Sequence, residues 1–532
     1  MKAFYLHLFP IIFLAFFSCT EEKQDFKSPN ILFVISDDQS FSHTSFSGSS
    51  FVDTPAFDRI ASEGVYFAHC IAGSPGCAPS RSSIVTGRYP WQNEQSGQHA
   101  SSWLKKYVPF IDVLGENGYM TGRTGKGVAP FQYASSPKDS LWRTTDAGGI
   151  AHSNIRYEDD KEGIEGYAKG VSGLDYFENF KHFIENKKKD QPFFFWFGPS
   201  EPHRAYEKGS WKRMGKNLED VEVPGFLPDN DEIRGDLLDY AVEIEWFDKH
   251  LGKMLKYLED IGELENTIVI VTSDNGKPFP RAKANAYEYG IHVPMAVRYP
   301  KAFPGGRVID APISFVDIAP TILEIAGASP EGMMPITGES FLKLLTSEGI
   351  NEKIFSYAYS GRERHSSSRY KNWGYPQRAI RSRDYLYIWN MKPERWPAGA
   401  PQKYNPKDTV QLLPINGIGS DGKYIAQSAY TDIDDCPTKT YLLEHGGDSD
   451  IQPYLDLAIA KRPEFELYDI RKDPDCLKNL VGKEGFTKVE ETLNKALVAE
   501  LIRTQDPRVV GPKKDVFDTY KRYSPIRSFP KP

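Results

Sequence analysis

Runs of apolar residues alternate with longer amphipathic stretches along most of the chain. Apolar runs rich in β-branched and aromatic residues predict strands buried on both faces, over residues 31–35, 193–197 and 268–271. A helical spacing of apolar positions predicts helices between them, over residues 111–117, 174–189 and 231–261. Strands separated by helices indicate an α/β fold, with a large mixed but mostly parallel sheet sandwiched by helices.

The pattern changes beyond about residue 370. Strict alternation predicts an antiparallel hairpin and a helical spacing predicts a late helix, over residues 378–382, 385–390 and 488–503. Residues 397–430 are rich in Pro, Gly, Asn and Asp, which predicts a loop. We therefore expect a main domain over 28–375, a smaller C-terminal α+β subdomain over 376–510, and a tail over 511–532 that either wraps the fold or hangs loose.

The N-terminus has the pattern of an export signal. Lys2 precedes an apolar stretch, residues 3–17, that is shorter than the roughly 20 residues of a membrane-spanning helix. It ends in Ser18-Cys19, as a bacterial lipobox does, and residues 19–27 form a polar tether. We predict a signal peptide over 1–18 and a lipid on Cys19, which would anchor an exported protein to a bacterial outer membrane or cell surface. The simpler alternative is cleavage near Ser18 and release into the periplasm.

Composition and charge narrow the classes of function. The 532 residues are 40% hydrophobic and 26% charged, which excludes a disordered or fibrous chain. Lys and Arg number 65 against 72 Asp and Glu, so the net charge of −7 leaves no basic excess for binding nucleic acid. A sulfated or phosphorylated substrate would therefore have to be bound by a local cationic pocket.

The cysteines have the spacing of neither a disulfide framework nor a zinc site. Besides Cys19, the chain carries Cys70, Cys77, Cys436 and Cys476. In an oxidising compartment a bridge between Cys436 and Cys476 is compatible with the sequence, which does not decide the pairing.

Polar residues suited to catalysis or metal binding follow the predicted strands, where ligands bind in parallel sheets. These residues are Asp37, Asp38, His203, Asp274 and Asn275. Four of them offer hard oxygen donors, which suit Ca²⁺ better than a soft metal. The alternative for each pair is an ordinary helix cap or turn former.

One segment resembles the signature of a known enzyme family. Residues 77–88 read CAPSRSSIVTGR, and the type I sulfatases have Cys-x-Pro-Ser-Arg, then four further residues, then Thr-Gly. Other segments resemble the family in its order, at residues 30–38, 118–126, 274–276, 283–294, 316–321 and 466–474. Within the family, residues 201–204 and 274–280 look most like the heparan N-sulfatase (sulfamidase) branch.

This resemblance implies an alkaline-phosphatase-like fold and a modified active-site residue. In the family, a formylglycine-generating enzyme oxidises the cysteine at the position of Cys77, and the hydrated aldehyde attacks the sulfur of a sulfate ester. The resemblance also implies one Ca²⁺ per chain, with ligands from Asp37, Asp38, Asp274, Asn275 and residue 77.

Basic residues take further roles by the same resemblance. Arg81 is expected to hold the hydrated formylglycine, and Lys126 and Lys283 to contact it and the sulfate oxygens. His203 is the expected proton donor to the leaving group. Arg204 is expected to bind a substrate carboxylate or a neighbouring sulfate.

One position departs from the family pattern. The family usually has Lys-x-His where this chain reads Lys126-Gly127-Val128. The absent histidine normally contacts the formylglycine. His99 or His152, from neighbouring loops, is expected to substitute for it near the substrate.

Together these features predict a sulfatase that cleaves sulfate esters, or sulfamates, of sulfated polysaccharides or their oligosaccharides, in bacterial degradation of algal polysaccharide such as ulvan. The alternatives are a glycosaminoglycan (heparan) N- or O-sulfatase, a phosphoesterase of the same superfamily, and an inactive glycan-binding homologue that lacks the histidine. Aromatic residues of the C-terminal half either stack on sugars or pack in the core, namely Trp373, Tyr375, Tyr385, Tyr387, Trp389 and Trp396.

Overall fold

A seven-stranded sheet forms the centre of the molecule. The computed structural model describes residues 28–136, 141–158, 164–346, 355–420, 425 and 428–531. The strands are β1 (Asn30–Ser36), β2 (Val65–Phe67), β4 (Met120–Gly125), β5 (Phe193–Gly198), β6 (Thr267–Ser273), β8 (Met295–Arg298) and β9 (Arg307–Ile309). Their order is β4-β5-β1-β6-β8-β2-β9, and only β8 runs antiparallel to its neighbours. The mixed, mostly parallel sheet predicted from the sequence is confirmed.

The three strands predicted from apolar runs lie side by side in the middle of this sheet. β1 pairs in parallel with β5 and β6, and every residue of the three strands is buried. A strand covered on both faces needs apolar side chains on both, which is why these runs are continuous rather than alternating. The register pairs Ser36 with Ser273, so the residues that follow β1 and β6 emerge next to each other.

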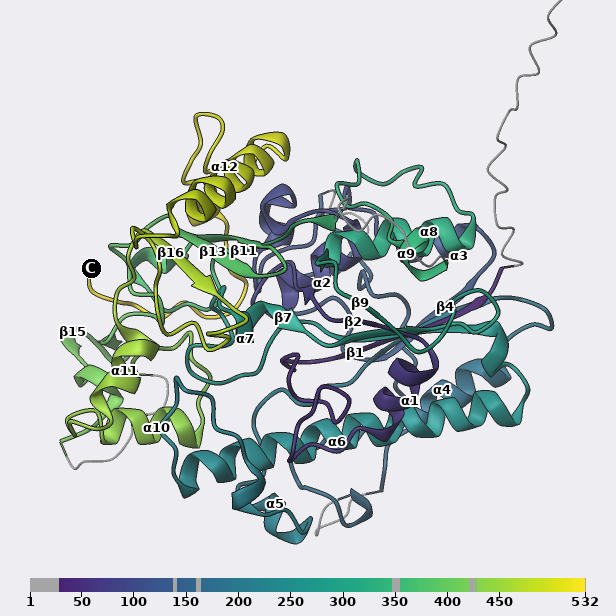
Figure 1. The fold of residues 1–532 in the computed structure, drawn as a ribbon, viewed down its shortest axis with the longest axis horizontal. Helices are drawn as coiled ribbons and strands as arrows, with labels where there is room; N and C mark the ends of the chain where they lie inside the picture. Colours follow the sequence, from purple (N-terminus) through teal and green to yellow (C-terminus); the bar gives the residue numbers. More distant parts are fainter. Residues whose placement is uncertain are drawn as a thin grey trace, which may run out of the picture.

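Helices cover both faces of the sheet (Figure 1). One face carries α1 (Pro55–Glu63), α4 (Tyr176–Glu185) and α6 (Asp231–Asp260). The other carries α2 (Cys77–Thr86), α3 (Phe110–Glu116), α8 (Ile318–Ala326) and α9 (Leu342–Thr346). The helices predicted from periodicity correspond to α3, α4 and α6. α4 is shorter than predicted because Asp175 caps its start and Asn186 ends it.

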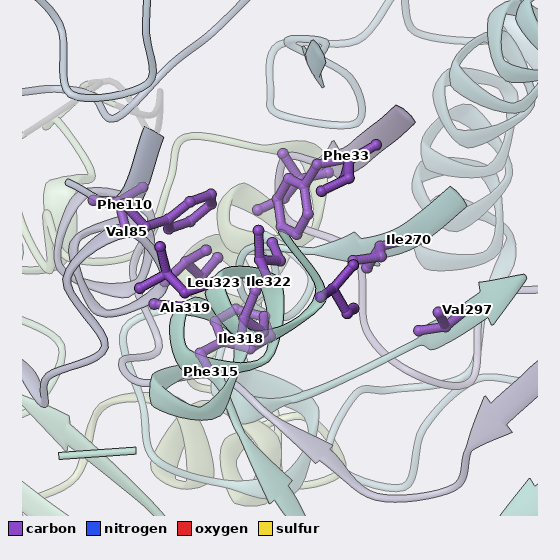
Figure 2. Close-up of a cluster of buried hydrophobic side chains, with 14 of the residues drawn as sticks. Phe33, Val85, Phe110, Ile270, Val297, Phe315, Ile318, Ala319, Ile322 and Leu323 are labelled. Carbon is purple, nitrogen blue, oxygen red and sulfur yellow. The ribbon is translucent and has the colours of Figure 1, made fainter. Parts of the chain in front are cut away.

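The apolar core of this second face gathers around α8. Figure 2 shows Ile322 of α8 among side chains from four other elements, Phe33 and Ile270 of the sheet, Val85 of α2 and Phe110 of α3. This packing fixes the position of α2 against the sheet, and therefore the position of Cys77 at its first turn.

A smaller antiparallel sheet lies at one end of the central sheet (Figure 1). Its order is β11 (Ala358–Arg362), β12 (Gln377–Arg381), β13 (Tyr385–Asn390) and β16 (Phe465–Asp469). α12 (Thr487–Arg503) packs on it through the buried Leu493, Leu497 and Leu501. The predicted hairpin and late helix are therefore present, while β11 begins before the expected boundary at residue 376.

The described residues also form further short strands and α-helices. They are β3 (Cys70–Ile71), β7 (His292–Val293), β10 (Ile313–Ser314), α5 (Ser210–Arg213), α7 (Glu288–Ile291), β14 (Tyr404–Asn405), β15 (Asp408–Leu412), α10 (Pro437–Glu444) and α11 (Gln452–Ile459). β14 and β15 form a hairpin inside the stretch predicted as a loop, where Asn405 accepts a hydrogen bond from the backbone N–H of Lys407 and closes the turn.

The C-terminal tail packs on the fold. Phe517 and Phe529 are 1% and 4% exposed, so residues 511–531 wrap the molecule rather than hang loose. The bridge that the sequence left open is not formed, because Cys436 and Cys476 are free thiols. Within the described residues, no helix is long and apolar enough to cross a membrane. The predicted signal peptide (1–18), the lipidated Cys19 and the tether (19–27) lie outside those residues.

Candidate active site

Four oxygen-bearing side chains meet where β1 and β6 end. Asp37 and Asp38 follow β1, Asp274 and Asn275 follow β6, and all four are buried. The backbone N–H of Asp38 donates to Asp274 Oδ1 at 3.0 Å, and Asn275 Nδ2 donates to Asp38 Oδ1 at 2.8 Å. The structure thus brings all four predicted metal ligands into one cluster.

Cys77 lies at the first turn of α2, against this cluster. Its Sγ lies within 4.8 Å of a carboxylate oxygen of Asp37 and of Asp274. Burial raises the pKa of the Cys77 thiol to about 11, so the thiol is protonated at neutral pH. Arg81, one helical turn later, donates from Nε to Asp274 Oδ2 at 2.6 Å and from Nη1 to the carbonyl oxygen of Lys126 at 3.0 Å.

Two lysines from distant segments reach carboxylates of this cluster. Lys126 follows β4 and donates from Nζ to Asp37 Oδ2 at 2.5 Å. Lys283 Nζ lies 2.6 Å from Asp38 Oδ2 and 2.9 Å from Asp434 Oδ2. Although burial opposes it, the neighbouring carboxylates raise the pKa of both lysines, so both are cations.

His203 stands at the open side of the cluster, with 39% of its side chain exposed. Its Nδ1 is hydrogen-bonded to the carbonyl oxygen of Arg204 at 2.6 Å. Because a carbonyl oxygen only accepts, Nδ1 carries the proton and donates it. Nε2 is therefore the atom turned to the cluster, 3.9 Å from Asp38 Oδ2.

The carboxylates of the cluster differ in how easily they ionise. Burial opposes the charge of Asp37, but Lys126 and His203 hold its pKa well below the ordinary value. Burial and the charge of Asp37 raise the pKa of Asp274 to about 7. The ionised form of Asp274 would therefore be favoured by one further positive charge in the cluster.

The cluster fits a hard divalent cation. Asp37 Oδ1 and Asn275 Oδ1 are buried, and neither has a hydrogen-bond partner among the described residues. An unsatisfied buried polar atom costs about 1–3 kcal/mol, and native structures contain few of them. A Ca²⁺ ion accepts carboxylate and amide oxygens as ligands, so it would satisfy both atoms and relieve the repulsion at Asp274.

Arg204 does not face this cluster, which corrects the prediction that it binds substrate. Its Nη1 and Nη2 donate to the two carboxylate oxygens of Asp236 at 2.7 and 2.9 Å, and Nε donates to the carbonyl oxygen of Pro278. All three guanidinium nitrogens are thus engaged inside the protein, and the side chain is 5% exposed. Arg204 ties the loop after β5 to α6.

His152 is not brought to the cluster either. Its backbone N–H donates to the carbonyl oxygen of Arg123 in β4, and its ring packs edge-on against Phe183 of α4, with centroids 5.0 Å apart. This contact places the imidazole on the face of the sheet that α4 covers, so His152 does not replace the histidine that is missing after Lys126.

His99 and a histidine that the sequence did not predict, His365, lie near Cys77. Their ring centroids are 5.1 Å apart, and His365 Nδ1 lies 3.1 Å from where a Cβ on Gly76 would be. Burial lowers the pKa of His365 to about 4 and that of His99 well below its ordinary value, so both imidazoles are neutral at neutral pH. A neutral imidazole, such as that of His365, has one nitrogen that can accept a proton.

The residues that sequence reasoning missed come from the C-terminal half. Asp434 belongs to the acidic run 432–435, and His365 to the arginine-rich run 362–369. Neither follows a predicted strand. Local charge density was the one signal that could have directed attention to them.

Comparisons with known proteins identify the family of this chain. The family model described as "Sulfatase" matches residues 29–328, and the model described as "N-sulphoglucosamine sulphohydrolase, C-terminal" matches residues 282–396. An ulvan-active sulfatase of Formosa agariphila is 26% identical, covering 90% of this chain and 80% of its own length. N-sulphoglucosamine sulphohydrolase of Homo sapiens is 26% identical, covering 91% of this chain and 92% of its own.

A solved structure shares the fold. It holds a protein in complex with its substrate D-glucosamine-2-N,6-O-disulfate, and it matches this chain with a TM-score of 0.58 at 22% identity, covering 90% of this chain and 98% of the other. The expected alkaline-phosphatase-like architecture is thereby confirmed. Since the sulfatase model spans more than half of the sequence and the cluster lies inside that span, the chain belongs to the sulfatase family and is a sulfuric ester hydrolase.

Proposed function

We propose that this enzyme removes sulfate from sulfated saccharides by means of a formylglycine formed from Cys77. The observation that carries the proposal is the position of Cys77, which is 2% exposed and lies among carboxylates at the start of a helix. A protonated thiol is a poor nucleophile, so the position suits a modified residue better than thiol chemistry. The hydrated aldehyde would supply one oxygen that attacks sulfur and a second hydroxyl that allows sulfate to leave.

The four oxygen donors are proposed to hold one Ca²⁺ beside residue 77. When bound, the ion supplies positive charge that neutralises the oxygens of an anionic sulfate. The residues that would hold it are Asp37, Asp38, Asp274 and Asn275.

Of the three basic side chains around Cys77, we propose that the two lysines contact substrate and that the arginine does not. Lys126 and Lys283 present ammonium groups next to Cys77, and we assign them to the sulfate oxygens. Arg81 is fully buried and fixed by Asp274, so it orients residue 77 instead.

Two protons have to move in the reaction, and histidines near residue 77 and the oxygen cluster are the candidates to move them. His203 is partly exposed, with Nε2 toward the cluster, so we assign its imidazolium form, which carries a proton on Nε2 as well as on Nδ1, the protonation of the leaving oxygen or nitrogen. His365, supported by His99, is assigned the place of the absent histidine, because a neutral imidazole beside residue 77 can accept a proton during sulfate release.

The relatives suggest the substrate. Sulfated polysaccharide of algal origin, such as ulvan, is proposed because ulvan-active sulfatases of Formosa agariphila match most of this chain. A glycosaminoglycan sulfate or sulfamate is the second candidate, favoured by the match to the N-sulphoglucosamine sulphohydrolase C-terminal region. We further propose maturation by a formylglycine-generating enzyme and export with a lipid on Cys19, which would place the enzyme at a bacterial outer membrane or cell surface.

The test is sulfate release from defined ulvan and heparan oligosaccharides, after co-expression with a formylglycine-generating enzyme. We expect release by the wild type, none by Cys77→Ala, and peptide mass spectrometry that shows residue 77 as the aldehyde. Removal of Ca²⁺ by a chelator should abolish release, added Ca²⁺ should restore it, and the circular dichroism spectrum should stay unchanged.

Other results would select the alternatives. Full activity with an unmodified Cys77 would overturn the proposal. Hydrolysis of a phosphate diester without sulfate release would indicate a phosphoesterase. Saccharide binding by the matured protein without any turnover would indicate an inactive glycan-binding homologue.

A further inference from the structure

Residues 521–531 pass along the rim of the active site and are tied down at both ends. The backbone N–H of Tyr523 donates to the carbonyl oxygen of Ala100 at 3.0 Å, and that of Tyr404 donates to the carbonyl oxygen of Ser528 at 2.8 Å. Ala100 follows His99, which lies near Cys77. The segment therefore lies where it can contact whatever enters the site.

Basic side chains gather along this segment, namely Arg364, Lys403, Arg522 and Arg527. Their charges repel one another. Burial and Arg527 lower the pKa of both Arg522 and Lys403, and burial and Arg522 lower that of Arg364 to about 10. A group of neighbouring cations with lowered pKa values is stabilised by an anion.

Several guanidinium nitrogens of this group are left without a partner. Arg364 Nε, Arg522 Nε and Arg527 Nη1 are buried, and none has a hydrogen-bond partner among the described residues. Arg364 as a whole is 2% exposed, so its charge is held in the protein without a carboxylate on that nitrogen. Planar guanidinium groups with free N–H donors recognise carboxylate and sulfate oxygens.

A cavity of about 140 Å³ opens beside the cationic segment. Its walls include Tyr370, Trp373, Arg395, Trp396, Gln402 and Lys531. A cavity of similar volume in another protein holds a six-membered ring. An aromatic wall with a few polar groups is the usual lining of a site for an organic ligand.

Of the six aromatic residues considered in the sequence, two line this cavity, Trp373 and Trp396. Tyr375 and Tyr387 are fully buried in the core. Tyr385 and Trp389 pack against Phe486 and Phe465, as ordinary core residues do.

The cavity and the catalytic cluster share one stretch of chain. Arg369 lines the cavity, and its Nη2 lies 2.5 Å from Asp432 Oδ2. Two residues later, Asp434 accepts a hydrogen bond from Lys283, which also contacts Asp38 in the cluster. The cavity is therefore linked to the catalytic cluster through Arg369, Asp432 and the nearby Asp434.

We propose that residues 521–531 and the cavity beside them form a second saccharide subsite, which binds a neighbouring sugar residue that carries its own anionic group. The sugar ring lies against Trp373 and Trp396, and its sulfate or carboxylate is bound by Arg522 and Arg527. The inference rests on the proposed function and narrows its substrate to saccharides with at least two anionic groups.

The test compares three disaccharides that carry the same cleavable sulfate and a second sugar that is neutral, sulfated or a uronic acid. Arg527→Gln should lower kcat/KM for the two doubly anionic substrates by about tenfold more than for the neutral one. The sulfated and uronic arms show which anion the subsite takes. Trp396→Ala should reduce kcat/KM for all three disaccharides relative to an aryl sulfate. Lys407→Gln, which removes an exposed cation from the β14–β15 turn, should leave every ratio unchanged.

Binding gives a readout that does not depend on turnover. Titration calorimetry on Cys77→Ala should show tighter binding of the doubly anionic disaccharides, and added Arg527→Gln should remove that difference. Sulfate release by the wild type with ratios that neither variant changes would overturn the subsite and leave the proposed function intact. Failure of the wild type to release sulfate would overturn the function, and the calorimetric comparison would still decide whether the subsite exists.

Discussion

At the residue scale, the site depends on buried charges that stabilise one another. Lys126 and Lys283 are cations because carboxylates surround them, and Asp37 is ionised because the lysines are there. His203 differs from these groups, because it is partly exposed and is held by one hydrogen bond to a carbonyl oxygen.

If His203 protonates the leaving group, its loss should harm substrates with poor leaving groups most. A sugar alkoxide needs that proton, and a nitrophenolate hardly does. His203→Ala should therefore cut turnover of a sulfated saccharide by on the order of 10²- to 10⁴-fold, and that of an aryl sulfate far less. Equal losses on both substrates would show that His203 binds sulfate instead.

The three candidate substitutes for the missing histidine make a matched series. His365→Ala should lower kcat for sulfate release by roughly 10²-fold, because its imidazole lies beside residue 77. His99→Ala should have a smaller effect, since His99 acts through His365. His152→Ala serves as the control and should leave kcat unchanged, because its ring packs on Phe183. Steady-state kinetics with a saccharide substrate decides among them, and a large effect at His152 alone would refute the assignment.

At the element scale, the sequence predicted those strands and helices that have a local pattern of apolar residues. The apolar runs predicted β1, β5 and β6, and because the carboxyl ends of neighbouring parallel strands meet at one edge, the ligands that follow β1 and β6 could be placed together. The β14–β15 hairpin was not predicted, because all residues of β15 are exposed and its composition is that of a loop. Asp434 and His365 were missed because the contacts of a loop with distant residues leave no periodic signal.

α12 offers a test of how the C-terminal sheet is held. Leu497 is fully buried against that sheet, so Leu497→Ala should lower the free energy of unfolding by about 2–5 kcal/mol. Ile502, on the same helix, is 48% exposed, and Ile502→Ala should change it by less than about 0.5 kcal/mol. Urea denaturation measures both, and equal effects would mean that α12 does not pack as described.

The buried carboxyl group of Asp248, in α6, makes the free energy of unfolding depend on pH. It contacts the first turn of α1. Its carboxylate oxygens accept hydrogen bonds from the backbone N–H groups of Ala56 and Phe57, both at 2.8 Å, yet burial raises its pKa to about 7 from an ordinary value of 3.8. The folded state therefore holds a proton that the unfolded chain has lost, so this group's contribution to stability falls as pH rises from 3.8 to about 7.

Asp248→Asn removes that titration. The free energy of unfolding of the wild type minus that of Asp248→Asn should therefore decrease as pH rises through this window, and level off above it. Urea denaturation at several pH values measures the difference, with Asp260→Asn, an exposed change on the same helix, as the control. A difference that increases with pH would show that the carboxyl group is charged in the folded state throughout.

At the scale of the whole molecule, the active site is assembled from both halves of the chain. The central sheet supplies the oxygen donors, whereas Asp434, His365 and the basic tail arrive with the smaller sheet and the segments around it. The C-terminal half therefore contributes side chains that lie in or beside the central cluster.

A substitution at Asp434 tests how far activity depends on the C-terminal half. Asp434 gives Lys283 its second carboxylate from the C-terminal half, and 27% of its side chain is exposed. Asp434→Asn should lower kcat/KM for sulfate release by roughly tenfold to hundredfold, since Lys283 loses part of what holds it in place, and should change the melting temperature little. Asp450→Asn, on the exposed surface, is the control. A loss of stability as large as the loss of activity would contradict a positioning role.

The burial of Cys77 has a consequence for the order of events in biosynthesis. A maturation enzyme has to bind residues on both sides of the thiol, but α2 is buried along its whole length, from Cys77 to Thr86. Once the sheet and α8 have packed on that helix, the residues that follow Cys77 in it cannot be bound by another enzyme without undoing the core. If Cys77 is converted to formylglycine, the conversion has to come before the domain has folded. The yield of active enzyme then depends on the rate of modification relative to the rate of folding.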